Sequence, residues 1–336
     1  MTGKGKEQSR PQPGSAEAVT RRVRRVLADN PGPFTHHGTA TFLVGAGRDL
    51  AVIDPGPQHE AHLDALIAAI GGRHVSYILV THTHRDHSPL ARALAERTGA
   101  PILAFGPHGA GARRLAPKIA DLMPEGEFEA GADWNFRPDV MIGDDARIVG
   151  DGWMIRAIHT PGHAANHLCF SLEEEGILFT GDHVMGWSTS VIAPPDGDMA
   201  AYMCSLERLL GRDQDRLYLP THGPVIREPH AHVRQLLHHR RLREAAIRRL
   251  LAEMQEASIA DLVLRIYPEL DPRLYPAAAA STLAHLIALI EEGKVMPVSP
   301  SDDGSLDKPD TDATLHFPAW AFRRFLTARM LPETRA

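Results

Sequence analysis

Thr81-His82-Thr83-His84-Arg85-Asp86-His87 is the stretch of sequence that decides the fold of this chain, and it directly follows a run of four apolar residues. Such a run is typical of a buried β-strand. Imidazole and carboxylate groups are the ligands that zinc and similar divalent ions prefer. His82 and His84 lie two residues apart, so both can point the same way from an extended segment. Asp86 and His87 follow on the turn and can face a second position. The stretch therefore predicts a metal centre at the rim of a sheet.

Three later segments have the same form, an apolar run that ends in a short turn with histidine or aspartate beside glycine. They are Ile158-His159-Thr160-Pro161-Gly162-His163, Phe179-Thr180-Gly181-Asp182 and Thr221-His222-Gly223-Pro224. Glycine allows the sharp turn that each of them needs. The alternative is a solvated loop that is rich in histidine by chance, because the chain has 20 histidines. A centre with two ions needs more ligands than one loop supplies, so the repeated pattern favours the metal centre.

In this order, the motifs HxHxDH, TPGH, FTGD and THGP resemble those of the metallo-β-lactamase superfamily of binuclear metallohydrolases, over about residues 20–298. The resemblance implies an α/β protein: the four-layer αβ/βα sandwich of that superfamily, followed by a small winged-helix-like domain. Carried over position by position, it implies two divalent ions, with zinc expected, held by His82, His84 and His163, by Asp86, His87 and His222, and by Asp182 as the bridge between them.

The resemblance also implies a hydrolase that uses a hydroxide bridging the two metal ions. Two divalent ions about 3.5–4 Å apart lower the pKa of a shared water enough for it to ionise at neutral pH. Asp182 and Asp86 are then the catalytic carboxylates, since Asp182 spaces the ions and Asp86 orients the hydroxide. Asp54, at a strand end, is either a partner of a ligand imidazole or a turn residue. Three histidines beside the ligands are expected to be structural or to support ligands, namely His159, His167 and His183.

The metal ligands do not determine which bond is broken, so three classes of function stay open. Residues 30–35 and 52–57 look like the branch that contains β-lactamase-like protein 2, which implies a phosphodiesterase or endoribonuclease acting on single-stranded RNA. Ala40 departs from that branch, where we expect an asparagine near the mouth of the site. The second class is a hydrolase of thioesters, lactones or β-lactams. The third is a non-enzymatic module that binds nucleic acid or a protein partner, against which the complete set of ligands argues.

The composition is that of a globular protein, because 43% of the residues are apolar. The net charge of −6 argues against a protein dominated by nonspecific affinity for nucleic acid. The two cysteines, Cys169 and Cys204, are far apart and expected to be reduced. The N-terminus lacks the apolar core of a secretory signal, and the longest uncharged run near the C-terminus, 277–290, is too short to cross a membrane. We therefore expect a cytoplasmic protein without membrane contact.

The alternation of strand-like and helical segments predicts a catalytic domain over residues 18–228. Residues 1–17 are polar and are expected to form a disordered leader. Residues 106–150 interrupt the alternation and are interpreted as a lid over the site or as a surface decoration. Strands are expected near 41–44, 50–53, 75–80, 102–105, 153–158, 167–172, 177–180 and 217–219, and helices near 59–70, 89–98 and 198–210, with Ser88 as the cap of the second helix.

Residues 229–298 change to helical patterns followed by a turn into a short strand, which resembles a winged-helix-like domain. Its basic residues gather in the first helix, which therefore either attracts RNA or presents a solvated face. Residues 299–336 are interpreted as a linker followed by an amphipathic segment at 317–331 with Trp320, Phe322 and Phe325. We expect this segment to dock on the body of the protein or on a second subunit, which would make a homodimer.

Overall fold

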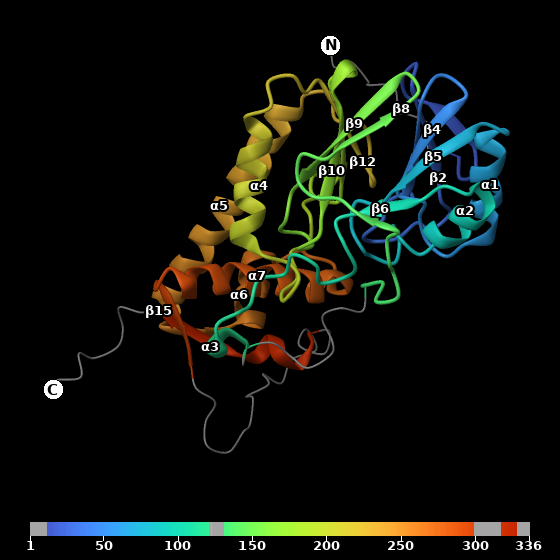
Figure 1. Cartoon of the computed structure of the whole chain (residues 1–336). Coiled ribbons are helices and arrows are strands. Elements are labelled where there is room, and N and C mark those ends of the chain that lie inside the picture. Colours follow the sequence, from blue (N-terminus) through green and yellow to red (C-terminus); the bar gives the residue numbers. More distant parts are fainter. Residues whose placement is uncertain (1–11, 121, 123–130, 299–316, 328–336) are drawn as a thin grey trace, which may run out of the picture.

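The computed structural model describes residues 12–120, 122, 131–298 and 317–327. In this part of the chain, two sheets lie face to face (Figure 1). The first has the order β1-β2-β3-β4-β5-β6-β7 and contains β1 Ala16–Ala18, β2 Val23–Leu27, β3 Ala40–Val44, β4 Asp49–Ile53, β5 His74–Leu79, β6 Ile102–Ala104 and β7 Val140–Met141. The second has the order β12-β11-β10-β9-β8 and contains β8 Arg147–Gly150, β9 Trp153–His159, β10 Leu168–Leu172, β11 Ile177–Gly181 and β12 Leu217–Pro220.

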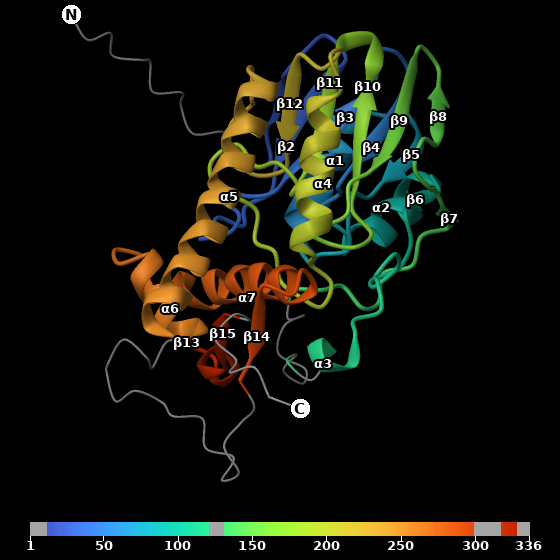
Figure 2. The ribbon, with the colours of Figure 1, turned by 90° about the vertical axis from the view of Figure 1, so that its left-hand side faces the viewer.

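Helices cover the outer face of each sheet, which gives the four layers seen edge-on in Figure 1, and Figure 2 shows α4 in front of the second sheet. The first sheet packs on α1 and α2 through Leu66, Ile78 and Leu94, and the second packs on α4 and α5 through Tyr202 and Val233. The core between the sheets contains Phe42, Phe170 and Phe179. The helices are α1 Glu60–Ile70, α2 Ala91–Thr98, α4 Met199–Leu210 and α5 Pro229–Met254, with a short α3 at Pro117–Ala120 and a 3-10 turn, η1, at Glu173–Glu175. The predicted four-layer α/β sandwich is confirmed.

The winged-helix domain combines three helices with a small sheet. Its helices are the second half of α5, α6 Ile259–Ile266 and α7 Tyr275–Glu291, which follows the 3-10 turn η2 Pro272–Leu274. Ser258 caps α6 by accepting a hydrogen bond from the amide of Asp261, whose carboxylate in turn accepts from the amide of Ser258. The sheet has the order β13-β15-β14, with β13 Glu256–Ser258, β14 Val295–Pro297 and β15 Arg324–Thr327.

The described part of the C-terminal segment completes this sheet. A 3-10 turn, η4 Ala319–Phe322, leads into β15, which lies between β13 and β14. Trp320 and Phe322 are buried in the core of the winged-helix domain, and Phe325 is fully buried there. Of the two expected destinations for the segment, the body of its own chain is the one observed, whereas residues 328–331 lie outside the described residues.

Two of the sequence predictions are wrong at their boundaries. Residues 16 and 17, which we assigned to a disordered leader, belong to β1, where Ala16 pairs with Val26; residues 1–11 lie outside the described part. Ser88 does not cap α2, which begins at Ala91, because its hydroxyl donates to Asp133 Oδ2 at 2.7 Å. In both cases the residue pairs with a partner elsewhere in the chain, Val26 for Ala16 and Asp133 for Ser88, which the local sequence pattern does not reveal.

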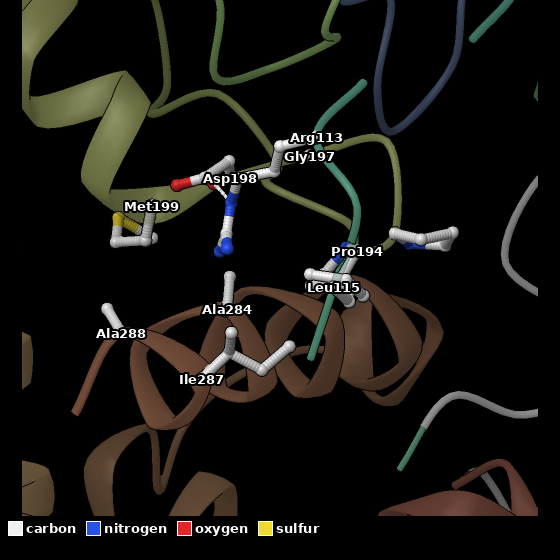
Figure 3. Close-up of a pocket in the computed structure, with 10 residues that line it drawn as sticks. Arg113, Leu115, Pro194, Gly197, Asp198, Met199, Ala284, Ile287 and Ala288 are labelled. Atoms are coloured by element: carbon white, nitrogen blue, oxygen red, sulfur yellow. Dashed lines mark hydrogen bonds and ion pairs between the residues drawn. The ribbon is translucent and has the colours of Figure 1, made fainter. Parts of the chain in front are cut away.

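The two domains share α5 and contact each other along α7. Val233 in the first half of α5 belongs to the core of the catalytic domain, whereas Leu251 in the second half belongs to that of the winged-helix domain. Arg113 adds an ionic link, because its guanidinium contacts Asp198 at the start of α4 (Figure 3). The same guanidinium contacts Glu291 at the end of α7. The helical stretch 272–291 is long and apolar enough to cross a membrane, yet α7 is largely buried between these elements, as expected of a core helix.

Candidate metal centre

All of the predicted ligands follow strands whose carboxyl ends lie at one edge of the sandwich. β5 precedes the HxHxDH loop, β9 precedes His163, β11 precedes Asp182 and β12 precedes His222. β11 and β12 are parallel, and β9 and β11 both run antiparallel to β10 between them, so their carboxyl ends point the same way. Loops from distant parts of the sequence thus meet at one edge of the two sheets.

One cluster consists of His82, His84 and His163. The Nε2 atom of His82 lies 2.9 Å from Nδ1 of His84, and Nε2 of His163 lies 3.1 Å from the same atom. His82 is 1% exposed and His163 is 9% exposed. Three imidazole nitrogens that converge at a buried point match the three-histidine ligand sets of zinc sites.

The second cluster consists of Asp86, His87, Asp182 and His222. The Nε2 atom of His222 lies 3.0 Å from Oδ2 of Asp86 and 3.3 Å from Oδ1 of Asp182. The Nε2 atom of His87 lies 3.5 Å from Oδ2 of Asp182. That same carboxylate oxygen is 3.8 Å from Nε2 of His163 in the first cluster. Asp182 therefore lies between the two clusters, as expected of a bridging ligand.

The electrostatics of the seven side chains fit two divalent cations. Burial, together with the neighbouring histidines, lowers the pKa of His82 well below its usual value and that of His84 to about 3, so both imidazoles are neutral and have a lone pair to donate. Burial also opposes protonation of His222, but the carboxylates of Asp182 and Asp86 raise its pKa to about 10. The buried carboxylate of Asp182 and the partly buried carboxylate of Asp86 thus create a negative potential that a cation satisfies better than protons on the ligands.

Two buried polar atoms without a hydrogen bond support the same fit. Among the described residues, Nε2 of His87 and Oδ1 of Asp182 are buried and form no hydrogen bond. Buried polar atoms are nearly always paired, so such exceptions require an explanation. Both atoms face the second cluster, and coordination to a metal ion would satisfy both. The structure therefore brings all seven predicted residues together in an arrangement that fits two ions, and their role as ligands stays a prediction.

Asp54 holds the ligand loops from behind. It has a left-handed backbone, with φ of 50°, at the end of β4. Its Oδ1 accepts from the amide of Thr81 at 2.8 Å, and its Oδ2 accepts from Nδ1 of His87 at 2.9 Å and from the hydroxyl of Thr221 at 3.2 Å. The bond to Nδ1 leaves Nε2 of His87 free to bind a metal ion. The structure thus supports Asp54 as the hydrogen-bond partner of the predicted ligand His87, rather than as a turn residue alone.

Asp54→Asn should therefore weaken metal binding by roughly 10–100-fold, the usual effect of losing such a partner. Asparagine tolerates the left-handed backbone, but its amide group cannot accept the proton of His87 Nδ1 while its oxygen pairs with Thr81. Competition for Zn²⁺ with a chelating indicator measures the change. Asp64→Ala, an exposed aspartate in α1, is the control. An unchanged affinity in Asp54→Asn would show that Asp54 serves the turn alone.

Other residues also support the predicted ligands. Thr39 donates from its hydroxyl to Oδ2 of Asp86 at 3.4 Å, while the side chain of Asn30 holds Thr39 through two hydrogen bonds of 2.9 Å. His167 Nε2 accepts from the amide of Asp182 at 3.3 Å, which gives His167 the supporting role that we left open. Threonines next to ligand histidines, as in residues 81–84 and 221–222, were the available clue to this network.

His159 and His183 are structural in the described residues. The ring of His159 stacks on Phe105 with centroids 4.2 Å apart, and its Nε2 donates to a backbone carbonyl, that of Ala165, at 2.9 Å. His183 is fully buried and packs on Tyr202. Cys169 and Cys204 are both free thiols, in agreement with the expected reduced state.

A cavity of about 650 Å³ opens above the two clusters. Its floor is polar and includes His84, Asp86, Asp182 and other ligands. Its walls are largely apolar and come from both domains, with Phe34, Met185, Val191, Ala193, Pro276, Ala277, Ala280, Pro318 and Trp320. The sequence did not reveal that α7 and the C-terminal segment reach the site. Cavities of this size, with few polar groups at one end, are typical of small-molecule sites.

Two further segments border the cavity, one after Asp182 and one within residues 106–150. Ser188 and Thr189 line the cavity, whereas Trp187 packs against His36, with ring centroids 4.9 Å apart. From the predicted lid, residues 108, 131 and 132 line the cavity, and residues 121 and 123–130 lie outside the described part. The described ends of this excursion therefore border the site, which the surface-decoration interpretation did not expect.

Known relatives cover most of the chain. It is 31% identical to lactamase-like protein aptB of Emericella nidulans, over 87% of this chain and 88% of the relative. It is 31% identical to the beta-lactamase-like protein 2 homolog of Drosophila melanogaster, over 85% of this chain and 93% of the relative. It is 32% identical to an atrochrysone carboxyl ACP thioesterase of Claviceps purpurea, over 77% of this chain and 76% of the relative.

Solved structures support the fold at lower identity. A beta-lactamase domain protein from Burkholderia ambifaria superposes with a TM-score of 0.74 at 23% identity, covering 96% of each chain. A metallo-beta-lactamase family protein from Thermus thermophilus superposes with a TM-score of 0.70 at 23% identity, covering 92% of this chain and 100% of that protein. Both alignments extend through the winged-helix domain because they cover nearly the whole chain.

Family models match both parts of the sequence. The model of the metallo-beta-lactamase superfamily matches residues 35–222, and that of the beta-lactamase associated winged helix domain matches residues 258–300. The first match spans more than half of the chain and contains all seven predicted ligands. The chain therefore belongs to the metallo-β-lactamase superfamily and carries the winged helix domain associated with it.

Proposed function

We propose that this protein is a metal-dependent hydrolase of thioesters with an apolar acyl group. One observation carries the proposal: the cavity joins the polar floor that contains Asp86 and Asp182 to apolar walls from α7 and Trp320. A substrate that matches this cavity has a hydrolysable carbonyl at one end and apolar surface at the other. The curated relatives support the same class, since several are named as thioesterases that act on a carboxyl ACP substrate.

The chain's own residues would bind and orient both reactants. Two bound metal ions would supply a water that is ionised at neutral pH and would polarise the carbonyl oxygen. Asp86 orients the attacking group, and the hydroxyl of Thr39 fixes the carboxylate of Asp86. The apolar wall removes water from around the acyl group and places its carbonyl over the floor of the cavity.

Single-stranded RNA remains the second candidate substrate, through the resemblance to the β-lactamase-like protein 2 branch. Helix α5 supports RNA binding less than its sequence suggested, because three of its arginines are already buried or paired within the protein. Arg240 is buried, Arg241 forms an ion pair with Glu207 at 2.9 Å, and Arg249 lies 3.7 Å from Glu253. The exposed arginines that remain, such as Arg248, are the ones through which RNA would have to bind.

Parallel assays on one metal-loaded preparation test the choice of substrate. We expect acyl thioesters to be hydrolysed, with kcat/KM rising along a series of longer acyl chains. Each methylene that becomes buried contributes about 0.8 kcal/mol, or up to roughly fourfold. Efficient cleavage of single-stranded RNA with no thioester turnover would favour the nuclease, and turnover of nitrocefin or a lactone alone would favour those substrates. Inactivity on all of them at full metal load would favour the non-enzymatic module.

Ala277→Leu should shorten the acyl group that the cavity accepts. Ala277 is on the apolar wall formed by α7, and a leucine there extends into the space that a long chain would fill. We expect KM for long-chain thioesters to rise, because each methylene excluded from an apolar pocket is worth roughly 1–3 kcal/mol. The kcat/KM for an acetyl thioester should stay within about twofold, because an acetyl group is too short to fill that space. Ala252→Leu, at an exposed position of α5, is the matched control. Equal losses on short and long substrates would contradict an acyl site at this wall.

Three expectations from the sequence stay predictions. Zinc is the expected metal because five imidazoles and two carboxylates form the ligand set. A cytoplasmic location is expected from the free thiols. A homodimer through the C-terminal segment would have to use residues other than Trp320, Phe322 and Phe325, which are buried in their own domain.

A further inference from the structure

Arg240 is a buried cation without an anionic partner. It lies in the middle of α5 and is 2% exposed. In the described part of the chain it forms no ion pair, and its Nε atom has no hydrogen-bond partner. Its guanidinium carbon lies 5.2 Å from the ring centroid of Tyr202, and Nη2 donates to the carbonyl oxygen of Ser190. Burying an unpaired charge is costly, so a specific role must favour it.

The histidines beside Arg240 are uncharged, so they do not add to its positive charge. His285 of α7 and His239 of α5 are its ionisable neighbours, together with Arg243. Burial, followed by the charge of Arg240, lowers the pKa of His285 to about 3 and that of His239 to about 4. Both imidazoles are therefore neutral at physiological pH, and the guanidinium of Arg240 contacts the carbonyl oxygen of Ser190 and the ring of Tyr202.

The segment that Arg240 holds, residues 190–192, also contacts two of the predicted metal ligands. The hydroxyl of Ser190 donates to the carbonyl oxygen of Asp182 at 2.5 Å. The carbonyl oxygen of Val191 accepts from Nδ1 of His163 at 2.7 Å. The second bond fixes the tautomer of His163, because a proton on Nδ1 leaves the lone pair of Nε2 for a metal ion.

A second contact from the C-terminal helices secures the same segment. The amide of Ile192 donates to the hydroxyl oxygen of Ser281 in α7 at 3.2 Å. Arg240 of α5 thus holds residue 190 and Ser281 of α7 holds residue 192, so the segment is fixed at both ends. These bonds connect elements 50 and 89 residues further along the chain to the loop that follows the bridging aspartate.

We propose that Arg240 and Ser281 are positioning residues through which α5 and α7 hold residues 190–192, and thereby orient His163 and Asp182 for metal binding. The C-terminal helices are then part of the apparatus that shapes the metal centre, in addition to walling the cavity. This inference rests on the metal centre and is independent of which substrate is hydrolysed.

Arg240→Met tests the inference, because methionine keeps much of the apolar volume and removes the donor. We expect its affinity for Zn²⁺, measured by competition with a chelating indicator, to fall about 10–100-fold. We also expect a changed visible absorption spectrum of the Co²⁺-loaded protein, since His163 would no longer be held in one orientation. Arg240→Lys, which retains a donor, should recover part of the affinity. Arg241→Ala, the exposed neighbour paired with Glu207, is the matched control and should change neither readout.

Ser190→Ala provides a second variant with a smaller change, which decides the question if Arg240→Met fails to fold. It removes the bond to the carbonyl of Asp182 and should also weaken Zn²⁺ binding. The double variant should lose less than the sum of the two single effects, because both act through one segment. Unchanged Zn²⁺ affinity and an unchanged Co²⁺ spectrum in Ser190→Ala, and in folded Arg240→Met, would overturn the inference. Wild-type protein that binds no metal would instead refute the centre itself.

Discussion

Asp182→Ala should abolish hydrolysis and release at least one of the two metal ions, while the protein stays folded. Asp182 is the one carboxylate that lies within 4 Å of ligand atoms in both clusters among the described residues, at 3.3 Å from His222 and 3.8 Å from His163. Its loss removes the ligand that spaces the ions and leaves the histidines of both clusters without an intervening negative charge. The effect should exceed the roughly 10–100-fold change expected for an outer partner such as Asp54.

The measurement combines metal content, hydrolysis and the circular dichroism spectrum of the same preparation. Asp182→Asn keeps the shape of the side chain and removes its charge, so it should show a similar loss. Asp64→Ala, which changes an exposed aspartate of α1, should behave as wild type. Full activity and unchanged metal content in Asp182→Ala would exclude it as the bridge.

The second large effect is expected for Gly162→Ala, in the turn that leads to His163. Gly162 has φ of 142°, and a Cβ atom added to it would lie 2.3 Å from Cα of Tyr202 in α4. A real Cβ cannot approach backbone so closely, so either the turn or the helix must move. Backbone strain of about 1–3 kcal/mol and overpacking of about 1–3 kcal/mol add up to a large share of the total stability of about 5–15 kcal/mol.

Gly162→Ala should therefore have a clearly lower free energy of unfolding and a weaker affinity for metal, because His163 moves with the turn. Denaturant titration of the metal-free protein separates the first effect from the second. Gly47→Ala is the matched control, since an added Cβ meets no atom within 4 Å at this exposed turn, and it should change stability by no more than about 0.5 kcal/mol. Equal stability of the two variants would contradict the close packing of the turn on α4.

The sandwich and its ligand loops were predictable because each ligand follows a strand with a clear apolar pattern. β5, β9 and β11 are all found close to their predicted ranges. β2 was missed because Arg24 and Arg25 occupy its centre and mask the alternation, although the strand is held on both sides by β1 and β3. β15 was missed because its partners lie on both sides of it in space and far from it in sequence.

The seven candidate ligands were predictable from residue type, whereas the surroundings that shape the centre were not. Histidine and aspartate in a fixed order form a recognisable signature. The carbonyl of Val191, the hydroxyl of Ser190 and the guanidinium of Arg240 act through backbone and through distant packing, which no local motif encodes. The apolar wall of the cavity depends in the same way on how α7 docks, so the sequence left the substrate class open.

The central claim is that the seven side chains hold two divalent ions, and metal content tests it most directly. Protein purified without chelator, loaded with Zn²⁺ and freed of excess ion should contain two equivalents per chain by elemental analysis. Two equivalents in the wild type, falling to one or fewer in Asp182→Ala, is the result that we expect. Wild-type protein that retains no divalent metal, or the same two equivalents after Asp182 is replaced, would contradict the account.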